Sequence, residues 1–333
     1  MPAGTVLLFG DLNVDNICSL PEIPPPGRDV YMSRVETHLG GAVCNSAVVL
    51  QGLRQPTRML GAVGEDQWGD FILTELKRAG ADTRFIVRKT AEDSGLIFIG
   101  VTPNGERTMF SYRGANSIIT PADLPEAILD GVSLIELSGY VFISPDQSET
   151  AWKLIHLAGA RGIPISLDTG LDPVVREPEI LRAALPHLRV CITGQEECQI
   201  LTGFDDLEQQ AAALLAQGIQ LVAIKLGGRG AYLAWPQGTL LLPAFKVEVL
   251  DTTGAGDSFS SGLVYGHLHG YSPCASGALA NALGGLATTV YGAAWLRREQ
   301  VLAFLKSVQQ AEPNHPAQCG IQEAVLRLGM EDA

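Results

Sequence analysis

The chain of 333 residues is long enough for one large α/β domain or for two average domains, and it can bury a large core. Its 46% hydrophobic and 18% charged residues are ordinary for a soluble globular protein. The formal net charge of −13 argues against nonspecific binding to nucleic acid or to an anionic membrane. A small anionic ligand stays compatible with this charge, because backbone amides can bind an anion locally.

The cysteines and the first residues bear on the cellular compartment. Six cysteines are scattered without a C-x-x-C pair or a histidine at metal-ligand spacing, so we expect reduced, buried thiols and no structural zinc. Neither a basic segment followed by an apolar stretch nor a membrane-spanning run is visible. We therefore expect a cytoplasmic protein.

The first predicted strand, residues 5–9, is a continuous apolar run of the kind that is buried on both faces of a sheet. Asn13 and Asp15 follow shortly after it. Ligands of open α/β sheets bind at the carboxyl ends of the strands, so these polar side chains are placed for a binding site.

Two glycines, Gly40 and Gly41, precede a predicted small-residue helix over residues 42–53, with Asn45 in its first turns. Carboxylate and amide groups suit vicinal hydroxyls, and glycine backbone lets a ligand approach closely. The polar pocket predicted for a polyhydroxylated molecule consists of Asn13, Asp15, Gly41 and Asn45. The alternative is structural, with Asp15 as a turn residue and Asn45 as a helix-start residue.

The rest of the chain alternates between strand-like and helix-like segments. Further strands are predicted over residues 30–39, 58–64, 96–101, 108–113, 134–137, 163–167, 190–192, 221–226 and 245–249. Further helices are predicted over residues 70–79, 149–160, 196–201, 207–217 and 260–267. The turn at residues 103–106, which contains Asn-Gly, indicates a hairpin.

This rhythm predicts a single α/β domain over residues 1–333, built on a doubly wound, mostly parallel sheet that helices cover on both faces. The segments at about 14–40 and 95–115 interrupt the rhythm. We expect these two segments to form one small β-sheet lid.

Residues 251–259, Asp-Thr-Thr-Gly-Ala-Gly-Asp-Ser-Phe, carry the strongest chemical signal. Small residues at Gly254, Ala255 and Gly256 let backbone N–H groups converge at the start of a helix, where an anion is favoured. Asp257 lies inside this anion-attracting turn. An anion site beside a base suits phosphoryl transfer, whereas the alternative is a glycine turn with Asp257 as a helix cap.

Several other enzyme classes are excluded by missing motifs. The sequence contains no Gly-Lys pair and hence no G-x-x-x-x-G-K-[ST] loop, no G-x-S-x-G elbow, and no H-R-D with D-F-G. The first strand is followed by Gly-Asp-Leu-Asn instead of a dinucleotide fingerprint, so a nicotinamide enzyme is weakly supported.

The chain resembles the ribokinase-like (PfkB) carbohydrate kinases from about residue 5 to about residue 305. Two signatures carry the resemblance: Gly-Gly-Ala-Val-Cys-Asn-Ser-Ala at residues 40–47, and the run at residues 251–259. The resemblance implies a three-layer α/β core with a β lid. It also implies transfer of the γ-phosphoryl group of ATP to a hydroxymethyl group of a sugar.

The resemblance also implies roles for the two signatures. Asp257 matches the catalytic base, and Gly254, Ala255 and Gly256 match the anion hole. The positions that match sugar contacts are Asp15, Gly41 and Asn45, with Asn13 and Gly40 as neighbours.

On the nucleotide side, Lys225 and the turn from Gly227 to Gly230 match the segment that holds the phosphates and ribose, and Asn281 falls where the family contacts adenine. Mg²⁺ is expected because the phosphate charge must be neutralised. K⁺ is a family expectation near Asp251 and Thr253.

One position departs from the family pattern. The N-x-x-E motif that organises metal and phosphates keeps its acid in Glu197, which would hold Mg²⁺ through water, but Gly194 replaces the asparagine. A water molecule in place of the missing amide is compatible with the reaction, at a cost in positioning.

The sequence leaves the substrate open among hexose, pentose, keto-sugar acid and nucleoside. Arg107 and Arg113 are candidates for an anionic substrate group or for holding the lid, and Glu136 or Ser138 occupies the position of a possible further sugar contact. A catalytically silent sugar- or nucleotide-binding regulatory protein is the alternative from another class. We expect a homodimer through the lid and no nucleic-acid or membrane partner.

Overall fold

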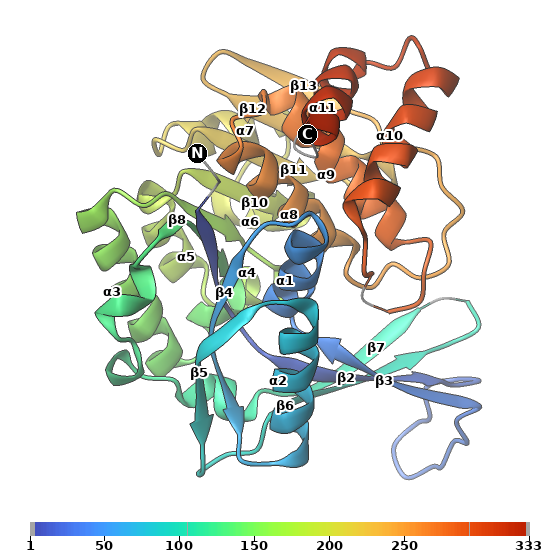
Figure 1. The fold of residues 1–333 in the computed structure, drawn as a ribbon. Helices are drawn as coiled ribbons and strands as arrows, with labels where there is room; N and C mark the ends of the chain where they lie inside the picture. The colour runs from blue at the N-terminus through green and yellow to red at the C-terminus, as the bar shows by residue number, and fades with distance from the viewer. Residues whose placement is uncertain (1–3, 105, 293, 331–333) are drawn as a thin grey trace.

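The computed structural model describes residues 4–104, 106–292 and 294–330. Its main sheet has nine strands in the order β13-β12-β11-β10-β9-β8-β1-β4-β5 (Figure 1). These strands are β1 (Thr5–Phe9), β4 (Thr57–Gly64), β5 (Asp82–Lys89), β8 (Val132–Ser138), β9 (Ile165–Asp168), β10 (Val190–Gly194), β11 (Leu221–Lys225), β12 (Ala231–Trp235) and β13 (Gly238–Leu242). Neighbours from β5 to β11 are parallel, and β12 and β13 add an antiparallel edge.

Helices cover both faces of this sheet, which makes three layers. One face carries α1 (Ala42–Gly52), α2 (Gln67–Ala79), α8 (Ala255–Leu268), α9 (Pro273–Ala287), α10 (Arg298–Ala311) and α11 (Gln318–Met330). The other face carries α3 (Pro145–Arg161), α4 (Leu171–Arg176), α5 (Pro178–Ala184), α6 (Gln195–Thr202) and α7 (Leu207–Leu215). The predicted three-layer, doubly wound α/β class is confirmed.

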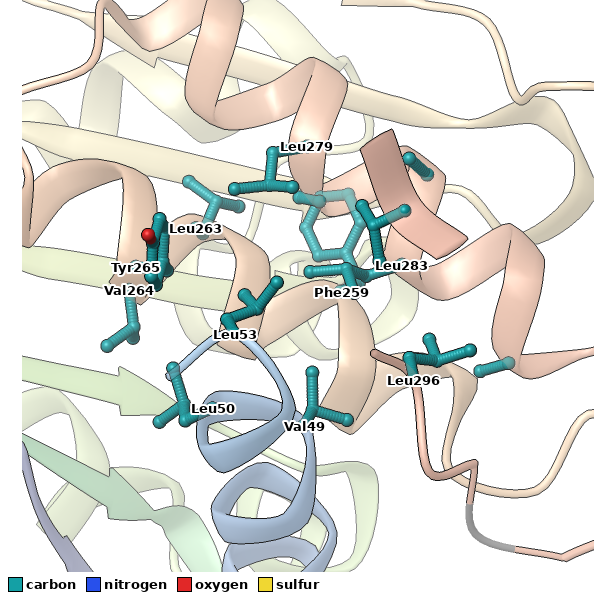
Figure 2. Close-up of a cluster of buried hydrophobic side chains, with 14 of the residues drawn as sticks. Val49, Leu50, Leu53, Phe259, Leu263, Val264, Tyr265, Leu279, Leu283 and Leu296 are labelled. Carbon is teal, nitrogen blue, oxygen red and sulfur yellow. The ribbon is translucent and has the colours of Figure 1, made fainter. Parts of the chain in front are cut away.

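The alternation of side chains along each strand divides the core in two. In β1, Val6 and Leu8 point to the α1 side, whereas Leu7 and Phe9 point to the α3 side, and all four are fully buried. Figure 2 shows the core on the α1 side, where labelled side chains of α1, α8 and α9, including Leu50, Phe259 and Leu283, pack together. This packing fixes the starts of α1 and α8 relative to each other.

A second, four-stranded sheet has the order β3-β2-β6-β7 and projects from one side of the molecule (Figure 1). Its strands are β2 (Asn13–Ser19), β3 (Arg34–Gly40), β6 (Gly95–Val101) and β7 (Arg107–Tyr112). Segments that are far apart in the sequence thus pair in one small sheet, with β2 antiparallel to β3 and parallel to β6. The hairpin of β6 and β7 is as predicted, and the predicted turn includes Gly105, which lies outside the described residues.

Several predicted boundaries differ from the structure. The strand predicted over residues 245–249 is wrong: the segment is irregular and mostly exposed, and its alternating pattern finds no neighbouring strand. Helices α2 and α3 begin earlier than predicted, because Asp66 caps the first and Pro145 takes the first position of the second. Strands β5, β12 and β13 were not predicted. In the described part of the chain, no helix combines the length and apolar composition that a membrane crossing requires.

Candidate active site

The predicted site residues gather along the carboxyl edge of the main sheet, where α1 and α8 begin. Helix α8 starts after Gly254, which takes a left-handed conformation at φ 70° and places Ala255 and Gly256 in the first turn. Asp257 follows in the same turn. Its Oδ2 accepts a hydrogen bond of 2.7 Å from Asn45 Nδ2 in α1. The two signatures, 212 residues apart in the chain, therefore meet through one side-chain contact.

Asp257 is a carboxylate with altered acidity. Burial raises its pKa to about 6, and the charge of Asp168 acts in the same direction. The Asn45 hydrogen bond and the charge of Lys225 oppose this rise. A carboxylate with a pKa near 6 is ionised at neutral pH and is a stronger base than an ordinary aspartate, as a general base requires.

Asp15 lies near the start of β2 and close enough to Asp257 for the two charges to interact. Burial, with the nearby Asp257 charge, raises the pKa of Asp15 to about 7. The glycines leave room for this side chain: a Cβ on Gly40 would lie 2.0 Å from Asp15 Oδ1, and one on Gly41 would lie 2.2 Å from Asp11 O. Space therefore requires glycine at both positions, and at Gly41 the backbone conformation, with φ 93°, requires it as well.

Several buried oxygen atoms in this region lack hydrogen-bond partners among the described residues, and Glu136 Oε2 is one of them. Two others belong to the predicted sugar contacts: Asp15 Oδ1 and Asn45 Oδ1, in residues that are only 7% exposed. Buried polar atoms in folded proteins are nearly always paired, so these two are placed to bind polar groups of a ligand. Asn13 differs, because its Oδ1 already accepts a hydrogen bond of 3.0 Å from Asn116 Nδ2.

Lys225, at the end of β11, forms an ion pair that the sequence did not reveal. Its Nζ donates to both carboxylate oxygens of Asp168 at 2.8 and 2.9 Å. Burial alone would lower the pKa of Lys225, but the carboxylates of Asp168, Glu197 and Asp257 outweigh burial and raise it. Lys225 is thus a cation surrounded by acidic groups. A signal for Asp168 existed, since it directly follows the buried strand predicted over residues 163–167.

Glu197 is held at the carboxyl end of β10, in the first turn of α6. Its Oε2 accepts hydrogen bonds from Gly194 N at 2.8 Å and from Thr169 Oγ1 at 2.5 Å. A Cβ on Gly194 would lie 2.8 Å from Glu197 Oε1. The space that a larger side chain would take is therefore next to this oxygen, where a water molecule or a hydrated metal ion can reach it.

Asp251 ties together two loops at the outer end of the site. Its Oδ1 accepts from Thr253 N and Thr253 Oγ1 at 2.9 and 2.8 Å, and its Oδ2 accepts from Gly292 N at 2.9 Å. Arg107 Nη1, on the small sheet, donates to Thr253 Oγ1 at 3.2 Å. The hydroxyl of Thr253 is thus engaged twice, and a positive charge already lies beside it.

Arg113 is fully engaged in a structural role. Its guanidinium makes two 2.8 Å hydrogen bonds with Asp11, and it also donates to Ser144 Oγ, Gln147 Oε1 and Tyr140 O. Nε and Nη2 form the fork that holds the Asp11 carboxylate, and Nη2 shares its two N–H groups among three acceptors. Arg113 therefore anchors the end of β7 to the segment after β1 and to α3.

Glu136 and Asn281 also take defined places. Glu136 is buried in β8, where it accepts a 3.0 Å hydrogen bond from Ser46 Oγ, and burial raises its pKa to about 8. Asn281 Nδ2, in α9, donates to Pro243 O at 2.8 Å, so this side chain fixes the loop after β13. Gly227 and Gly230 flank a single helical turn directly after Lys225 and Leu226.

Cavities lie at two opposite places in the described part of the molecule. One, of about 220 Å³, lies between the small sheet and residues 249–252, and Arg34 and Arg107 line it. The larger, of about 410 Å³, lies at the opposite edge of the main sheet near Trp235 and Tyr271. The smaller cavity adjoins Asp251 and therefore belongs to the region of the clustered polar residues.

Comparison with known proteins agrees with this geometry. Residues 4–297 match the model of the family described as pfkB family carbohydrate kinase. The chain is 28% identical to a ribokinase of Staphylococcus aureus over 271 residues, which cover 78% of this chain and 84% of that protein. It is 27% identical to a 2-dehydro-3-deoxygluconokinase of Thermoproteus tenax over 278 residues, covering 80% and 84%.

A solved structure shares the fold. It comes from E. coli, is described as a ribokinase II in complex with ATP and Mg²⁺, and matches with a TM-score of 0.82 at 22% identity. The match covers 91% of this chain and 99% of that chain.

Proposed function

The chain belongs to the pfkB family of carbohydrate kinases, and from this premise we propose that it transfers the γ-phosphoryl group of ATP to a hydroxymethyl group of a small carbohydrate. The observation that carries the proposal is the contact between Asn45 and Asp257. It joins a group suited to sugar hydroxyls to a base at the start of a helix that favours phosphate.

Asp257 acts as the general base in this proposal. The hydroxymethyl oxygen of a bound sugar would lie within hydrogen-bond reach of its carboxylate. This oxygen gives its proton to Asp257 as its bond to the γ-phosphorus forms and the bond from that phosphorus to the oxygen of the leaving ADP breaks. The Asn45 amide holds the carboxylate by donating to Oδ2. The sugar oxygen and Asp257 are then both next to the backbone N–H groups at the start of α8, where the phosphoryl group would bind.

Asp15 and Asn45 bind the sugar. Asp15 Oδ1 and Asn45 Oδ1 are buried, lack partners among the described residues, and accept hydrogen bonds from hydroxyl groups. The bare backbone at Gly40 and Gly41 lets the sugar ring approach, and Asn13, held by Asn116, completes the pocket. Since Arg113 is occupied by Asp11, a substrate carboxylate would have to be bound by another cation.

The backbone N–H groups of Gly254, Ala255 and Gly256 and the amine of Lys225 stabilise negative charge on the phosphoryl group. Gly227, Gly230 and the Asn281 region form the nucleotide side. Mg²⁺ fits beside Glu197, because one carboxylate with waters and substrate phosphates is its usual environment. When bound, Mg²⁺ neutralises phosphate charge.

A monovalent cation such as K⁺ fits the residues at Asp251 and Thr253 less well than Mg²⁺ fits beside Glu197. Asp251 would hold it, but Thr253 Oγ1 is engaged by Asp251 and by Arg107, whose charge lies in the same place. We therefore assign Asp251 and backbone carbonyls to this ion. The expected dependence of turnover on K⁺ is correspondingly weak.

A homodimer through the small sheet is part of the proposal. Large apolar side chains at alternating positions share one face of this sheet and are exposed: Val35, Phe98, Phe110 and Tyr112. A contiguous apolar face of this kind marks an interaction surface. The opposite face carries Arg34 and Arg107 and faces residues 249–252, so it belongs to the active site.

The test is ADP release from Mg·ATP with a panel of hexoses, pentoses, keto-sugar acids and nucleosides. We expect release that depends on one sugar class. Measurable ATP binding without turnover on any compound would instead support a silent binding protein, and turnover on nucleosides alone would move the substrate to that class.

A further inference from the structure

The Asp168 carboxylate is held between side chains of two different elements. Lys225 Nζ, from β11, contacts both its oxygens at 2.8 and 2.9 Å, and Ser260 Oγ, from α8, donates to Oδ2 at 2.6 Å. The Asp168 side chain is 14% exposed and the Lys225 side chain 22%. Because Ser260 also holds the Asp168 carboxylate, this largely buried ion pair restricts the conformations of the Lys225 side chain.

The held amine lies at the start of α8. Lys225 Nζ is 3.6 Å from the position that a Cβ on Gly256 would take, and Ser260 Oγ is 3.0 Å from Gly256 O. The ammonium group has three N–H donors, and the two Asp168 oxygens take two of them. The third donor can therefore serve a ligand at the first turn of the helix.

We propose that Asp168 is a positioning residue for phosphoryl transfer, which holds Lys225 Nζ beside the first turn of α8 so that the amine contacts the transferring group. The inference rests on the proposed kinase function. Lysine is a flexible point charge, and without Asp168 its amine would sample many positions and stabilise the developing charge less.

Asp168 also influences the base. After burial, its charge is the next cause that raises the pKa of Asp257, against the opposing Lys225 charge and Asn45 hydrogen bond. Removal of the Asp168 charge therefore lowers the pKa of Asp257. The pH profile therefore reports the effect of the Asp168 charge on the base, and the double variant with Lys225 reports whether Asp168 acts through the lysine.

The test compares Asp168→Asn, Lys225→Met and the double variant. For each single variant we expect a loss in kcat of about 100-fold, the size found for one lost contact to a developing anion. The double variant should lose about as much as Lys225→Met alone, because Asp168 acts through the lysine. The acidic limb of the kcat/KM profile of Asp168→Asn should move to lower pH.

Two further variants guard against misfolding. Ser260→Ala removes one Asp168 contact and keeps both charges, so it should lower kcat several-fold without moving the pH profile. Asp130→Asn removes an exposed aspartate paired with Arg161 at the opposite edge of the sheet, and should leave kcat unchanged. Thermal denaturation of every variant shows whether it folds. If Asp168→Asn does not fold, the kcat of Ser260→Ala tests the inference in its place.

A wild-type kcat and pH profile in folded Asp168→Asn, or fully additive losses in the double variant, would overturn the inference. An unaffected Ser260→Ala would do the same where Asp168→Asn is unfolded. Absence of sugar-dependent ADP release from the wild-type chain would refute the proposed function instead, and the two failures are therefore distinguishable.

Discussion

At the carboxyl edge of the main sheet, polar side chains are buried and held by one another, whereas on the small sheet large apolar side chains lie exposed. Asp257, Asp168 and Lys225 are fixed by contacts between strands and helices that share a core. The small sheet reaches this site through the 3.2 Å hydrogen bond from Arg107 to Thr253. Phe110 is 60% exposed on its other face.

The difference separates two tasks. Burial along the main sheet raises the pKa values of Asp257 and Glu136, and burial at the start of β2, where the small sheet joins the main one, raises that of Asp15. In the small sheet the start of β2 is buried against the site, whereas β7 is largely exposed. The buried part therefore serves the proposed chemistry, and the exposed part is the surface of the proposed dimer.

The largest expected effect is on the base. Asp257→Asn keeps the Asn45 contact possible but cannot accept the proton, so kcat should fall by about 100-fold or more. The affinity for ATP, measured by calorimetry, should change little. Wild-type turnover in this variant would remove Asp257 from the mechanism.

The next largest effect concerns the space around Asp15. Gly40→Ala places a Cβ where the Asp15 carboxylate lies, 2.0 Å from Oδ1, so the side chain must move and kcat/KM for the sugar should fall about 100-fold. The matched control is Gly159→Ala in α3, where a Cβ meets no atom within 4 Å. Equal kinetics for the two variants would contradict the crowded geometry.

The pH dependence of activity follows from the pKa of Asp257, about 6. The base works when ionised, so kcat/KM should be constant above pH 7 and fall toward tenfold per unit well below pH 6. Because Asp15 titrates nearby, with its pKa raised to about 7, the measured values belong to the pair. An acidic limb near pH 4 would contradict the burial of Asp257.

Stability should also depend on pH through Glu136. Its pKa is about 8 in the folded chain against 4.5 for the ordinary group, so between these values folding requires a proton that the unfolded chain does not hold. This contribution is fully present below pH 4.5 and is lost as the pH rises toward 8. Glu136→Gln, which can still accept from Ser46, should therefore gain in Tm relative to wild type between pH 5 and pH 8. A constant difference in Tm would contradict this prediction.

The smallest effect on activity is expected on the small sheet. Phe110→Lys places a charge on the exposed apolar face, so the proposed dimer should dissociate while activity per chain stays within about twofold. Sedimentation gives the mass, and Leu326→Lys, an exposed position on α11, is the control. An unchanged mass for Phe110→Lys would place the interface elsewhere.

The sequence predicted the parts of the site that lie within one segment. The glycines before Asn45 and those before Asp257 each mark a helix start, and the apolar runs before them mark strands with polar carboxyl ends. From this pattern the α/β class and the small sheet followed. The roles of the individual site residues remain predictions.

What the sequence could not give depends on the order of strands. Asp168, Glu197 and Lys225 come together because β9, β10 and β11 are neighbours, and no local pattern states that order. Arg113 looked available for a substrate anion until its contact with Asp11, 102 residues away, was known. The segment at residues 245–249 alternates like a strand, but it pairs with neither of the two sheets.

The most direct test of the account is the identity of the product. ³¹P NMR of the reaction with ATP and the preferred sugar should show a phosphomonoester whose phosphorus couples to a methylene group, as expected for transfer to a hydroxymethyl oxygen. ADP with inorganic phosphate and no phosphomonoester, or a phosphorus coupled to a ring methine, would contradict transfer to a hydroxymethyl group.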